Sequence, residues 1–459
     1  MSIKKNHKKF LEFRKQYPVF EYRKYYIRKT NNSLDFSFLF KMGDDIEFKP
    51  SYSVPWRDFY NLKNIDTDLL ESLIFHIGMV ELISYWKTAC PPEVVIHPFS
   101  LTDDQVDFWK KLYLNGLGEF FYLNGIKTSN DEFMTITSKG KKLKPFSIQT
   151  DNKKVMVPVG GGKDSVVTLE LLKESADKVI PMALNPRRAV VRSVEISGFS
   201  LDNAVVVNRK LDKKLLELNE KGFLNGHTPF SALLAFVTLL TAALAGIRNI
   251  ALSNESSANQ STVPGVNVNH QYSKSFEFEQ DFNSYYKKYI THDIDYFSFL
   301  RPLNELQIAA LFSRFPQHHL SFRSCNVGSK NDSWCGNCPK CLFTRIILGP
   351  FFAHDKMLQI FGKELLDDIK LKPYFDELTG KAEIKPFECV GTPDEVNAAL
   401  QKIKEKFNTG KMPVLLKTYN FADNKEKDYK LLISDFNVEN ILPSRYVKLL
   451  KEFLQRWIS

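Results

Sequence analysis

Cysteine is scarce in this chain, and its distribution excludes a secreted disulfide scaffold. Six of the 459 residues are cysteine, and four of these lie together between Cys325 and Cys341. Secreted scaffolds are short and spread their paired cysteines along the chain. The basic N-terminus also lacks an apolar run after it, so no secretory signal peptide is predicted. We therefore expect a cytoplasmic protein.

Long uncharged runs are equally rare. One stretch, Pro229 to Ile247, carries no charge and is long enough to span a membrane. It is rich in Ala, Thr and Ser, its first residue suits the first turn of a helix, and a strand-like run, Asn249 to Leu252, follows it at once. We therefore predict a helix buried in a large α/β domain, and no membrane insertion.

An excess of acidic residues is absent, since 63 Lys and Arg outnumber 53 Asp and Glu and give a net charge of +10. A basic chain suits anionic partners such as nucleotides, nucleic acid or acidic substrates. The basic residues are spread along the chain, so a solvated basic surface explains them as well as a nucleic-acid patch does. The length suits about three domains at roughly 150 residues each.

The predicted elements divide the chain into three parts. Residues 1–145 mix the strand and helix periods, which predicts an N-terminal α+β domain. Residues 146–350 alternate strands with helix-length segments, which predicts a parallel, doubly wound sheet. Residues 351–459 form a mainly helical C-terminal region. The predicted strands are 34–40, 45–49, 154–159, 178–184, 204–207, 249–252, 319–322, 414–419 and 429–434, and the predicted helices include 66–86, 103–114, 164–174, 363–369, 393–407 and 444–457. Glu81, inside the first apolar helix, is expected to pair with a neighbouring Lys or Arg.

A glycine loop follows the strand at 154–159. Gly160-Gly161-Gly162-Lys163-Asp164-Ser165 runs directly into a helical segment. Glycines let the backbone approach phosphate groups, and the free N–H groups at a helix start bind them. Ser165 adds a hydroxyl, Lys163 adds a positive charge, and Asp164 makes sense beside phosphates if Mg²⁺ lies between them. A tight strand–helix turn without a ligand is the alternative.

Two common phosphate motifs do not fit this loop. A Walker A loop needs a glycine where Val157 stands and a Ser or Thr where Asp164 stands, and a dinucleotide fingerprint needs another glycine spacing. The loop resembles the SGGxDS loop of the PP-loop ATP pyrophosphatases, with Gly160 in place of the usual serine. The resemblance implies an adenine nucleotide α-hydrolase-like fold that splits ATP into AMP and pyrophosphate.

The clustered cysteines form a second motif. Cys325, Cys335, Cys338 and Cys341 have the spacing C-x9-C-x2-C-x2-C. Two CxxC steps with a shared cysteine, and one more cysteine at loop distance, predict a tetrahedral thiolate site. Zn²⁺ is favoured, and an iron–sulfur cluster is the alternative. The region resembles the end of the 7-cyano-7-deazaguanine synthases, which are zinc-binding PP-loop enzymes whose first spacing is one residue shorter.

Polar residues follow the predicted strand at 249–252. Asn254 to Gln260 comes first and Asn267 to Glu279 next, and both should lie at the carboxyl edge of the sheet near the glycine loop. Glu255, His270 and Lys274 are the candidate acid–base groups within them. A solvated polar loop explains them equally well. Asn225-Gly226-His227, before the apolar helix, is a weaker candidate.

Several segments together resemble the MurL family of ATP-dependent UDP-N-acetylmuramoyl-L-alanyl-L-glutamate epimerases. They are HIGMVELISYWKTACPP, GLGEFFYLNGI, PVGGGKDS, SNESSANQS, VNHQYSKSFEFE and WCGNCPKC. The resemblance implies that ATP adenylates the terminal L-Glu of the UDP-linked muramoyl dipeptide, that the α-proton is removed and returned, and that D-Glu product, AMP and pyrophosphate are released. This is a step of peptidoglycan synthesis. His270, Lys274 and Glu255 are then the candidates for the base, with ATP, Mg²⁺ and Zn²⁺ as the expected cofactors.

Two other functions fit parts of the sequence. A PP-loop enzyme that modifies tRNA or a deazaguanine precursor would account for the basic charge and the cysteines. Against it, no RNA-binding module is recognisable, so we do not expect a nucleic-acid partner. A nucleotide sensor without catalytic activity would need only the loop, and the presence of Asp164 and Ser165 speaks against it.

Overall fold

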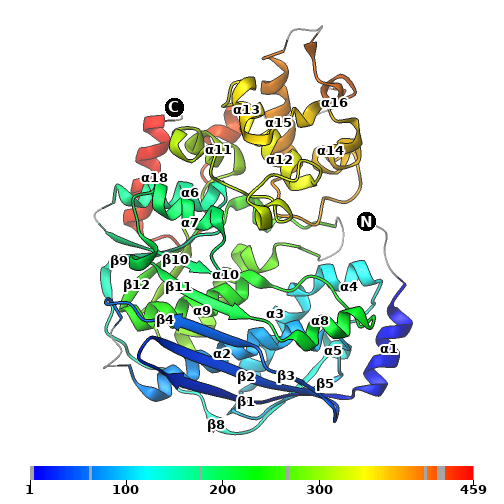
Figure 1. Ribbon diagram of the computed structural model, residues 1–459, viewed down its shortest axis with the longest axis vertical. Helices are drawn as coiled ribbons and strands as arrows, with labels where there is room; N and C mark the ends of the chain where they lie inside the picture. The colour runs from blue at the N-terminus through cyan, green and yellow to red at the C-terminus, as the bar shows by residue number, and fades with distance from the viewer. Residues whose placement is uncertain are drawn as a thin grey trace. The chain divides into compact units, whose positions relative to one another are not determined.

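The computed structural model describes residues 5–60, 65–175, 177–263, 268–407, 411–420 and 429–457. The chain forms two compact units, each assembled from three stretches of sequence (Figure 1). Unit 1 comprises Met1–Asn152, Val205–Ile250 and Asn267–Asp295, and unit 2 comprises Lys153–Ala204, Ala251–Val266 and Tyr296–Ser459. The first residue of the predicted polar segment 267–279 lies outside the described residues.

Unit 1 is built on a mixed sheet with the strand order β11-β4-β2-β1-β5-β7. β1, β2, β4 and β11 pair antiparallel in turn, whereas β5 and β7 continue the sheet parallel to β1. Every second residue of β2 is buried, as expected for a strand with one face on a core. The bounds are β1 (Val19–Lys29), β2 (Ser33–Met42), β3 (Ile46–Phe48), β4 (Ser51–Pro55), β5 (Glu93–Ile96), β7 (Thr135–Ser138) and β11 (Val205–Lys210).

Two apolar helices form the core beside this sheet. α2 (Thr67–Trp86) packs on β1 and β2, and α9 (Phe230–Ala245) packs on α2. A helix that is apolar on all sides is stable in water only when it is buried. α2 is long and apolar enough to cross a membrane, but 89% of that stretch is buried inside the protein. The predicted helix at 66–86 and the predicted burial of the apolar segment at 229–247 are both confirmed.

The predicted parallel sheet is found only in part, because the sheet that contains the strand at 204–207 is partly antiparallel. This strand is β11, which lies in unit 1 and pairs antiparallel with β4. The guanidinium of Arg209 on β11 binds the buried carboxylate of Glu81 at 2.8 and 2.9 Å, and the Tyr52 hydroxyl of β4 binds the same carboxylate. This buried ion pair, which a short apolar run does not reveal, fixes β11 beside β4. It also confirms the expected partner of Glu81.

Unit 2 contains a parallel pair, β9 (Asp151–Pro158) and β10 (Lys178–Leu184), joined by α6 (Lys163–Lys173). The strand order is β13-β12-β9-β10, with β12 at Ile247–Leu252 and β13 at Asp295–Ser298, and the first residues of β9, β12 and β13 belong to unit 1. The strand–helix–strand arrangement fits an α/β sheet. The doubly wound PP-loop fold itself stays a prediction.

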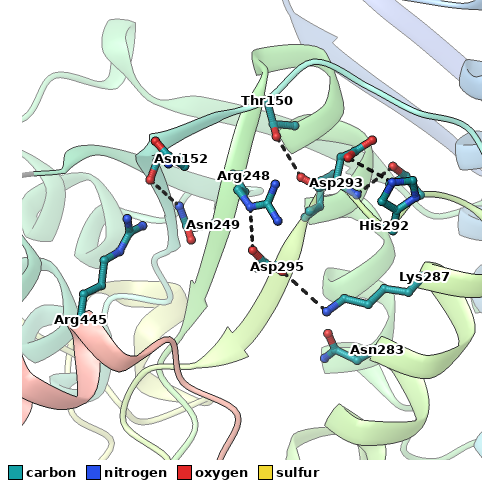
Figure 2. A network of polar contacts seen from close by, with 12 residues as sticks. Thr150, Asn152, Arg248, Asn249, Asn283, Lys287, His292, Asp293, Asp295 and Arg445 are labelled. Atoms are coloured by element: carbon teal, nitrogen blue, oxygen red, sulfur yellow. Dashed lines mark hydrogen bonds and ion pairs between the residues drawn. The ribbon is translucent and has the colours of Figure 1, made fainter.

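Polar contacts within unit 1 align the starts of β9, β12 and β13 (Figure 2). Asn249 Nδ2 donates to the Asn152 carbonyl at 3.0 Å, and Arg248 Nε binds Asp295 Oδ2 at 2.9 Å. Thr150 Oγ1 donates to the carbonyl of Asp293 at 2.9 Å. These bonds set the starts of the strands that lead into the glycine loop and into the polar segment after β12.

The helices of unit 2 pack in succession. α11 (Glu305–Ser313) packs on α6 and on α12 (Pro339–Leu348), and α12 packs on α14 (Lys372–Thr379) and α15 (Pro393–Lys404). The last three are among the yellow and orange helices of Figure 1. The remaining helices and strands are α1 (His7–Gln16), β6 (Phe99–Ser100), α3 (Asp103–Gly116), α4 (Gly118–Asn124), α5 (Asn130–Phe133), β8 (Lys141–Lys142), α7 (Arg188–Ile196), α8 (Lys213–Glu220), α10 (Phe276–Tyr289), α13 (His354–Phe361), α16 (Val414–Lys417), α17 (Tyr429–Ser434) and α18 (Ser444–Trp457).

Four predicted elements are wrong. The segments at 414–419 and 429–434 contain the helices α16 and α17 instead of strands, the segment at 319–322 is a turn, and 363–369 holds short 3₁₀ turns instead of a helix. In α16 the neighbouring residues Leu415 and Leu416 are both buried, which a half-buried strand would not allow. Runs of four to six residues are too short for their periodicity to separate helix from strand.

Candidate active site and metal centre

The glycine loop lies between β9 and α6, where the sequence placed it. Gly161 has a φ of +79°, and a Cβ there would lie 2.9 Å from backbone atoms of Ala189 and Val190. Glycine alone combines this backbone conformation with this close approach. The Gly161 carbonyl accepts the backbone N–H of Arg323 at 2.8 Å. The loop is therefore held between α7 and the segment that leads to Cys325.

The two other glycines have different surroundings. A Cβ at Gly160 would meet nothing within 4 Å, so the serine usual in PP-loop enzymes would fit there. Gly162 is the N-cap of α6, where a Cβ would lie 3.1 Å from Ser324 Oγ. Ser165 Oγ donates to the Gly162 carbonyl at 3.1 Å. Space for a side chain is therefore open at Gly160 and restricted at Gly162, directly before the first turn of α6.

Lys163 is buried, and its ammonium binds the carboxylates of Asp164 and Glu305. Burial alone would lower the pKa of Lys163, but these two carboxylates raise it well above its ordinary value. The lysine therefore stays charged. It joins the glycine loop to the first residue of α11 by a buried ion pair.

Glu305 is a residue that the sequence analysis missed. Its backbone N–H donates to Glu395 Oε1 at 2.7 Å, and its side chain is buried. Burial raises the pKa of Glu305, Lys163 lowers it, and the neighbouring carboxylates of Asp164 and Glu255 raise it further. The only sequence signal was its place after Asn304 at the start of a helix, which a helix cap explains by itself.

Glu255 and Lys385 complete this charged cluster of unit 2. Glu255, in the segment after β12, is 3% exposed and lies among the carboxylates that act on Lys385. Burial lowers the pKa of Lys385 to about 8, against the opposing effect of Glu395, Glu255 and Glu305. Lys385 Nζ also donates to Gln260 Oε1 at 2.7 Å. The structure thus brings Glu255 near Glu305 and adds Lys385, a lysine whose pKa burial lowers.

His270 and Lys274, the other candidate bases, lie in unit 1, whereas Glu255 lies in unit 2. His270 Nδ1 is 2.5 Å from Glu119 Oε2, and its ring centroid is 4.5 Å from that of His227. Lys274, at the end of a short 3₁₀ helix, is one of the charges that act on His227. Glu119 was not singled out from the sequence, because 151 residues separate it from His270.

The four clustered cysteines converge in unit 2, as predicted. The Sγ atoms of Cys325 and Cys338 are 3.8 Å apart, and those of Cys335 and Cys341 are 3.6 Å apart. Zn–S bonds of about 2.3 Å in a tetrahedron separate the sulfur ligands by about 3.8 Å. All four Sγ atoms lie within 4.8 Å of one another, so the donor set and its spacing fit a zinc ion.

Backbone and thiol donors favour a thiolate at Cys338, whereas the pKa values of Cys335 and Cys341 are raised, for Cys335 first by burial and for Cys341 first by its hydrogen bond to Cys338. The backbone N–H of Gly328 donates to Cys325 Sγ at 3.1 Å, and that of Cys341 donates to Cys338 Sγ at 3.4 Å. The hydrogen bond from the Cys341 thiol lowers the pKa of Cys338 to about 5. Burial opposes this shift, and the backbone N–H of Cys341 adds to it. A thiolate is the form that binds metal.

Comparison with known proteins identifies two matching family models. The MurL N-terminal domain matches residues 12–299, and the MurL C-terminal domain matches residues 321–431. The first range contains the glycine loop and the residues Glu119, His227 and His270. The second range contains the four clustered cysteines. Glu305 lies between the two ranges.

Three curated relatives are each named UDP-N-acetyl-alpha-D-muramoyl-L-alanyl-L-glutamate epimerase. The protein from Xanthomonas oryzae pv. oryzae is 34% identical over 363 residues, which cover 77% of this chain and 79% of the relative. The protein from Salinispora tropica is 34% identical over 339 residues, 72% of this chain and 73% of the relative. The protein from a Micromonospora species is 33% identical over 347 residues, 74% and 76% of the two chains.

Proposed function

This chain belongs to the MurL family, and from that premise we propose that it epimerises the terminal L-glutamate of UDP-N-acetylmuramoyl-L-alanyl-L-glutamate. The names of the three relatives support this substrate. The reaction would be a step of peptidoglycan precursor synthesis. The proposal keeps the cytoplasmic location that we expect from the sequence.

We further propose that the reaction consumes ATP at the glycine loop. The observation that carries this is the buried ion pair of Lys163 with Asp164 and Glu305 at the start of α6, beside the constrained backbone of Gly161. Unpaired N–H groups at a helix start bind phosphate oxygens. Mg²⁺, when bound with ATP, would be held by Asp164 and would neutralise phosphate charge.

Adenylation makes chemical sense of an ATP-dependent epimerase. The α-proton of a carboxylate is hardly acidic, because its removal places two negative charges on adjacent atoms. The α-carboxylate oxygen attacks the α-phosphorus of ATP, the bond to pyrophosphate breaks, and a mixed anhydride forms. The carbonyl of that anhydride accepts the electron pair of the broken C–H bond as an enolate. A base must lie within hydrogen-bond reach of the proton.

A labelled carboxylate tests the adenylate directly. The purified protein is given ATP, Mg²⁺ and the L-Glu substrate with the heavy isotope of oxygen in its terminal α-carboxylate. We expect pyrophosphate release and one heavy oxygen atom in AMP, because hydrolysis of the anhydride at carbon leaves that oxygen on phosphorus. Release of ADP and phosphate would contradict the adenylate, and AMP without label would contradict its hydrolysis at carbon.

For the four cysteines we propose a structural Zn²⁺. Four protein ligands leave no open position for substrate, which is typical of a structural site. The segment that ends in Cys325 donates the N–H of Arg323 to Gly161, so the ion would also order the backbone beside the phosphate loop.

A further inference from the structure

Basic side chains of unit 2 gather around one carboxylate. The arginine cluster consists of Arg187, Arg188, Arg192 and Arg323. Arg192 Nη1 is 2.8 Å from Asp332 Oδ2, and Arg188 Nη1 is 3.9 Å from the same oxygen. Arg323 Nε is 4.0 Å from the other carboxylate oxygen, Asp332 Oδ1. Three guanidinium groups therefore converge on a single carboxylate.

The fourth arginine binds the same segment of chain. Arg187 Nη1 donates to Ser329 Oγ at 2.6 Å, and Arg323 Nε also donates to the backbone carbonyl of Asp332 at 3.1 Å. Four positive charges against the single negative charge of Asp332 leave a net charge of +3 on the cluster and this carboxylate. One carboxylate neutralises one arginine, so an ion pair alone does not account for the other three. The excess charge attracts an anion.

The side chains of the cluster differ in their exposure. Only 11% of the Asp332 side chain and 13% of the Arg323 side chain are exposed, against 40% for Arg192 and 70% for Arg188. Burial lowers the pKa of Arg323 against the effect of Asp332, and the charge of Arg192 lowers it further. An arginine stays charged even so. A buried carboxylate thus fixes the cluster from one side, while Arg188 and Arg192 remain accessible to a ligand.

Both segments that carry the arginines contact the glycine loop. A Cβ at Gly161 would lie 2.9 Å from backbone atoms of Ala189 and Val190. These two residues directly follow Arg188 in α7. The backbone N–H of Arg323 donates to the Gly161 carbonyl at 2.8 Å. The arginine cluster and the glycine loop are therefore parts of one region of unit 2.

We propose that the arginine cluster binds a diphosphate group beside the glycine loop. A guanidinium group offers phosphate oxygens two parallel N–H donors, and two phosphates carry more charge than one arginine balances. Arg188 and Arg192 bind the phosphate oxygens, and Asp332 is the positioning residue that orients their side chains. The source of the diphosphate rests on the proposed function, in which ATP and the UDP-linked substrate each carry one.

The test measures the binding of two probes, inorganic pyrophosphate and UDP, each with Mg²⁺ and without the other, by calorimetric titration of the full chain. The variants are Arg188→Gln, Arg192→Gln and Arg192→Lys. The matched control is Arg456→Gln, which breaks another ion pair of unit 2 (Arg456 Nη1 to Glu174 Oε2, 3.0 Å). We expect each of the first two variants to weaken the binding of at least one probe about tenfold, since a hydrogen bond to a charged group contributes roughly that much. Arg192→Lys should recover part of the loss, and Arg456→Gln should match the parent.

The two probes separate the two sources of the diphosphate. Weaker binding of pyrophosphate, with a higher KM for ATP, assigns the cluster to ATP and its leaving group. Weaker binding of UDP, with a higher KM for the UDP-linked substrate, assigns it to that substrate. Either result supports the proposal. The change in kcat should be smaller than the change in KM, because these side chains bind the substrate and do not react with it.

Three outcomes would overturn the proposal. Unchanged binding of both probes in Arg188→Gln and Arg192→Gln would exclude the site. An equal loss of affinity in Arg456→Gln would attribute binding to the general positive charge of the protein. A loss confined to Arg192→Gln, together with a lower thermal midpoint, would make the cluster structural. The proposed function fails separately: a parent protein that binds the probes through the cluster but forms no D-glutamate would contradict the epimerisation and leave the diphosphate site in place.

Discussion

Backbone conformation at Gly161 links the phosphate loop to its neighbours. An alanine there would meet two costs, a φ of +79° and a Cβ 2.9 Å from the backbone of Ala189. We expect Gly161→Ala to lower the free energy of unfolding by about 1–3 kcal/mol and to weaken ATP binding at least tenfold, because strain at such positions costs that much and the loop must shift. Calorimetric titration with ATP and denaturant unfolding measure the two effects.

Gly198→Ala separates backbone strain from the close approach. Gly198 has a similar φ of +83°, but a Cβ there would meet nothing within 4 Å. This variant should lose about 1 kcal/mol of stability and bind ATP as the parent does. Equal loss of ATP affinity in both variants would show that general destabilisation, and not the loop, governs nucleotide binding.

Two pairs of interacting charged residues, one in each unit, join positions that lie far apart in the sequence. Glu119 and His270 are 151 residues apart, and Lys163 and Glu305 are 142 residues apart. The local sequence pattern identifies single candidate residues such as His270. Their partners come close only through tertiary packing, which the local pattern does not show. The sequence therefore found one member of each pair and missed the other.

Among the secondary-structure elements, α6 follows the phosphate loop and is tied to His318 by the carboxylate of Glu170. His318 Nε2 binds Glu170 Oε1 at 2.7 Å, and Lys173 Nζ binds Glu170 Oε2 at 2.9 Å. Burial would raise the pKa of Glu170, but the hydrogen bonds of His318, Lys173 and Ser197 lower it from 4.5 to about 2. The ionised carboxylate thus stabilises the folded chain above the unfolded pKa, and this stability is lost as pH falls toward the folded pKa.

We therefore expect Glu170→Gln to reduce the free energy of unfolding by roughly 2 kcal/mol at neutral pH. The difference from the parent should shrink as pH falls from about 4.5 to about 2. Unfolding in denaturant at several pH values measures it. A difference that stays constant across that pH range would contradict the contribution of the Glu170 carboxylate.

The four-cysteine cluster connects α12 to the phosphate loop through the segment before Cys325. We expect Cys335→Ser to lower the zinc content from one ion per chain, to lower the thermal midpoint, and to weaken ATP binding several-fold, because the N–H of Arg323 would no longer be held at Gly161. Metal analysis, thermal unfolding and ATP titration measure these effects. Cys389→Ser is the control, since Cys389 lies outside the cluster. Full zinc content in Cys335→Ser would contradict the site.

Elements with strong local signals were predicted well. The long apolar helices α2 and α9, the strand–glycine–helix step at 154–174 and the helix at 444–457 all appear in the structure. The short segments at 414–419 and 429–434 were assigned wrongly, because a few apolar residues suit either period. Tertiary packing decides whether these segments form helix or strand, and the local sequence does not reveal that packing.

For the whole molecule, topology was the part that sequence reasoning could not supply. Each unit is assembled from three separate stretches, and β11 joins the antiparallel strands of unit 1. The direction of a strand depends on its partner, and here a buried Arg209–Glu81 pair helps to choose it. The local periodicity of the sequence does not predict which strands pair or in which direction. The family resemblance, by contrast, extends over both units and is confirmed by the comparisons.

One measurement tests the central claim most directly. The protein is incubated in D₂O with ATP, Mg²⁺ and UDP-N-acetylmuramoyl-L-alanyl-L-glutamate, and the configuration and mass of the terminal glutamate are read after hydrolysis. The account predicts D-glutamate that carries one deuterium at the α-carbon, formed only when ATP is present. Recovery of L-glutamate without deuterium would contradict the proposed epimerisation.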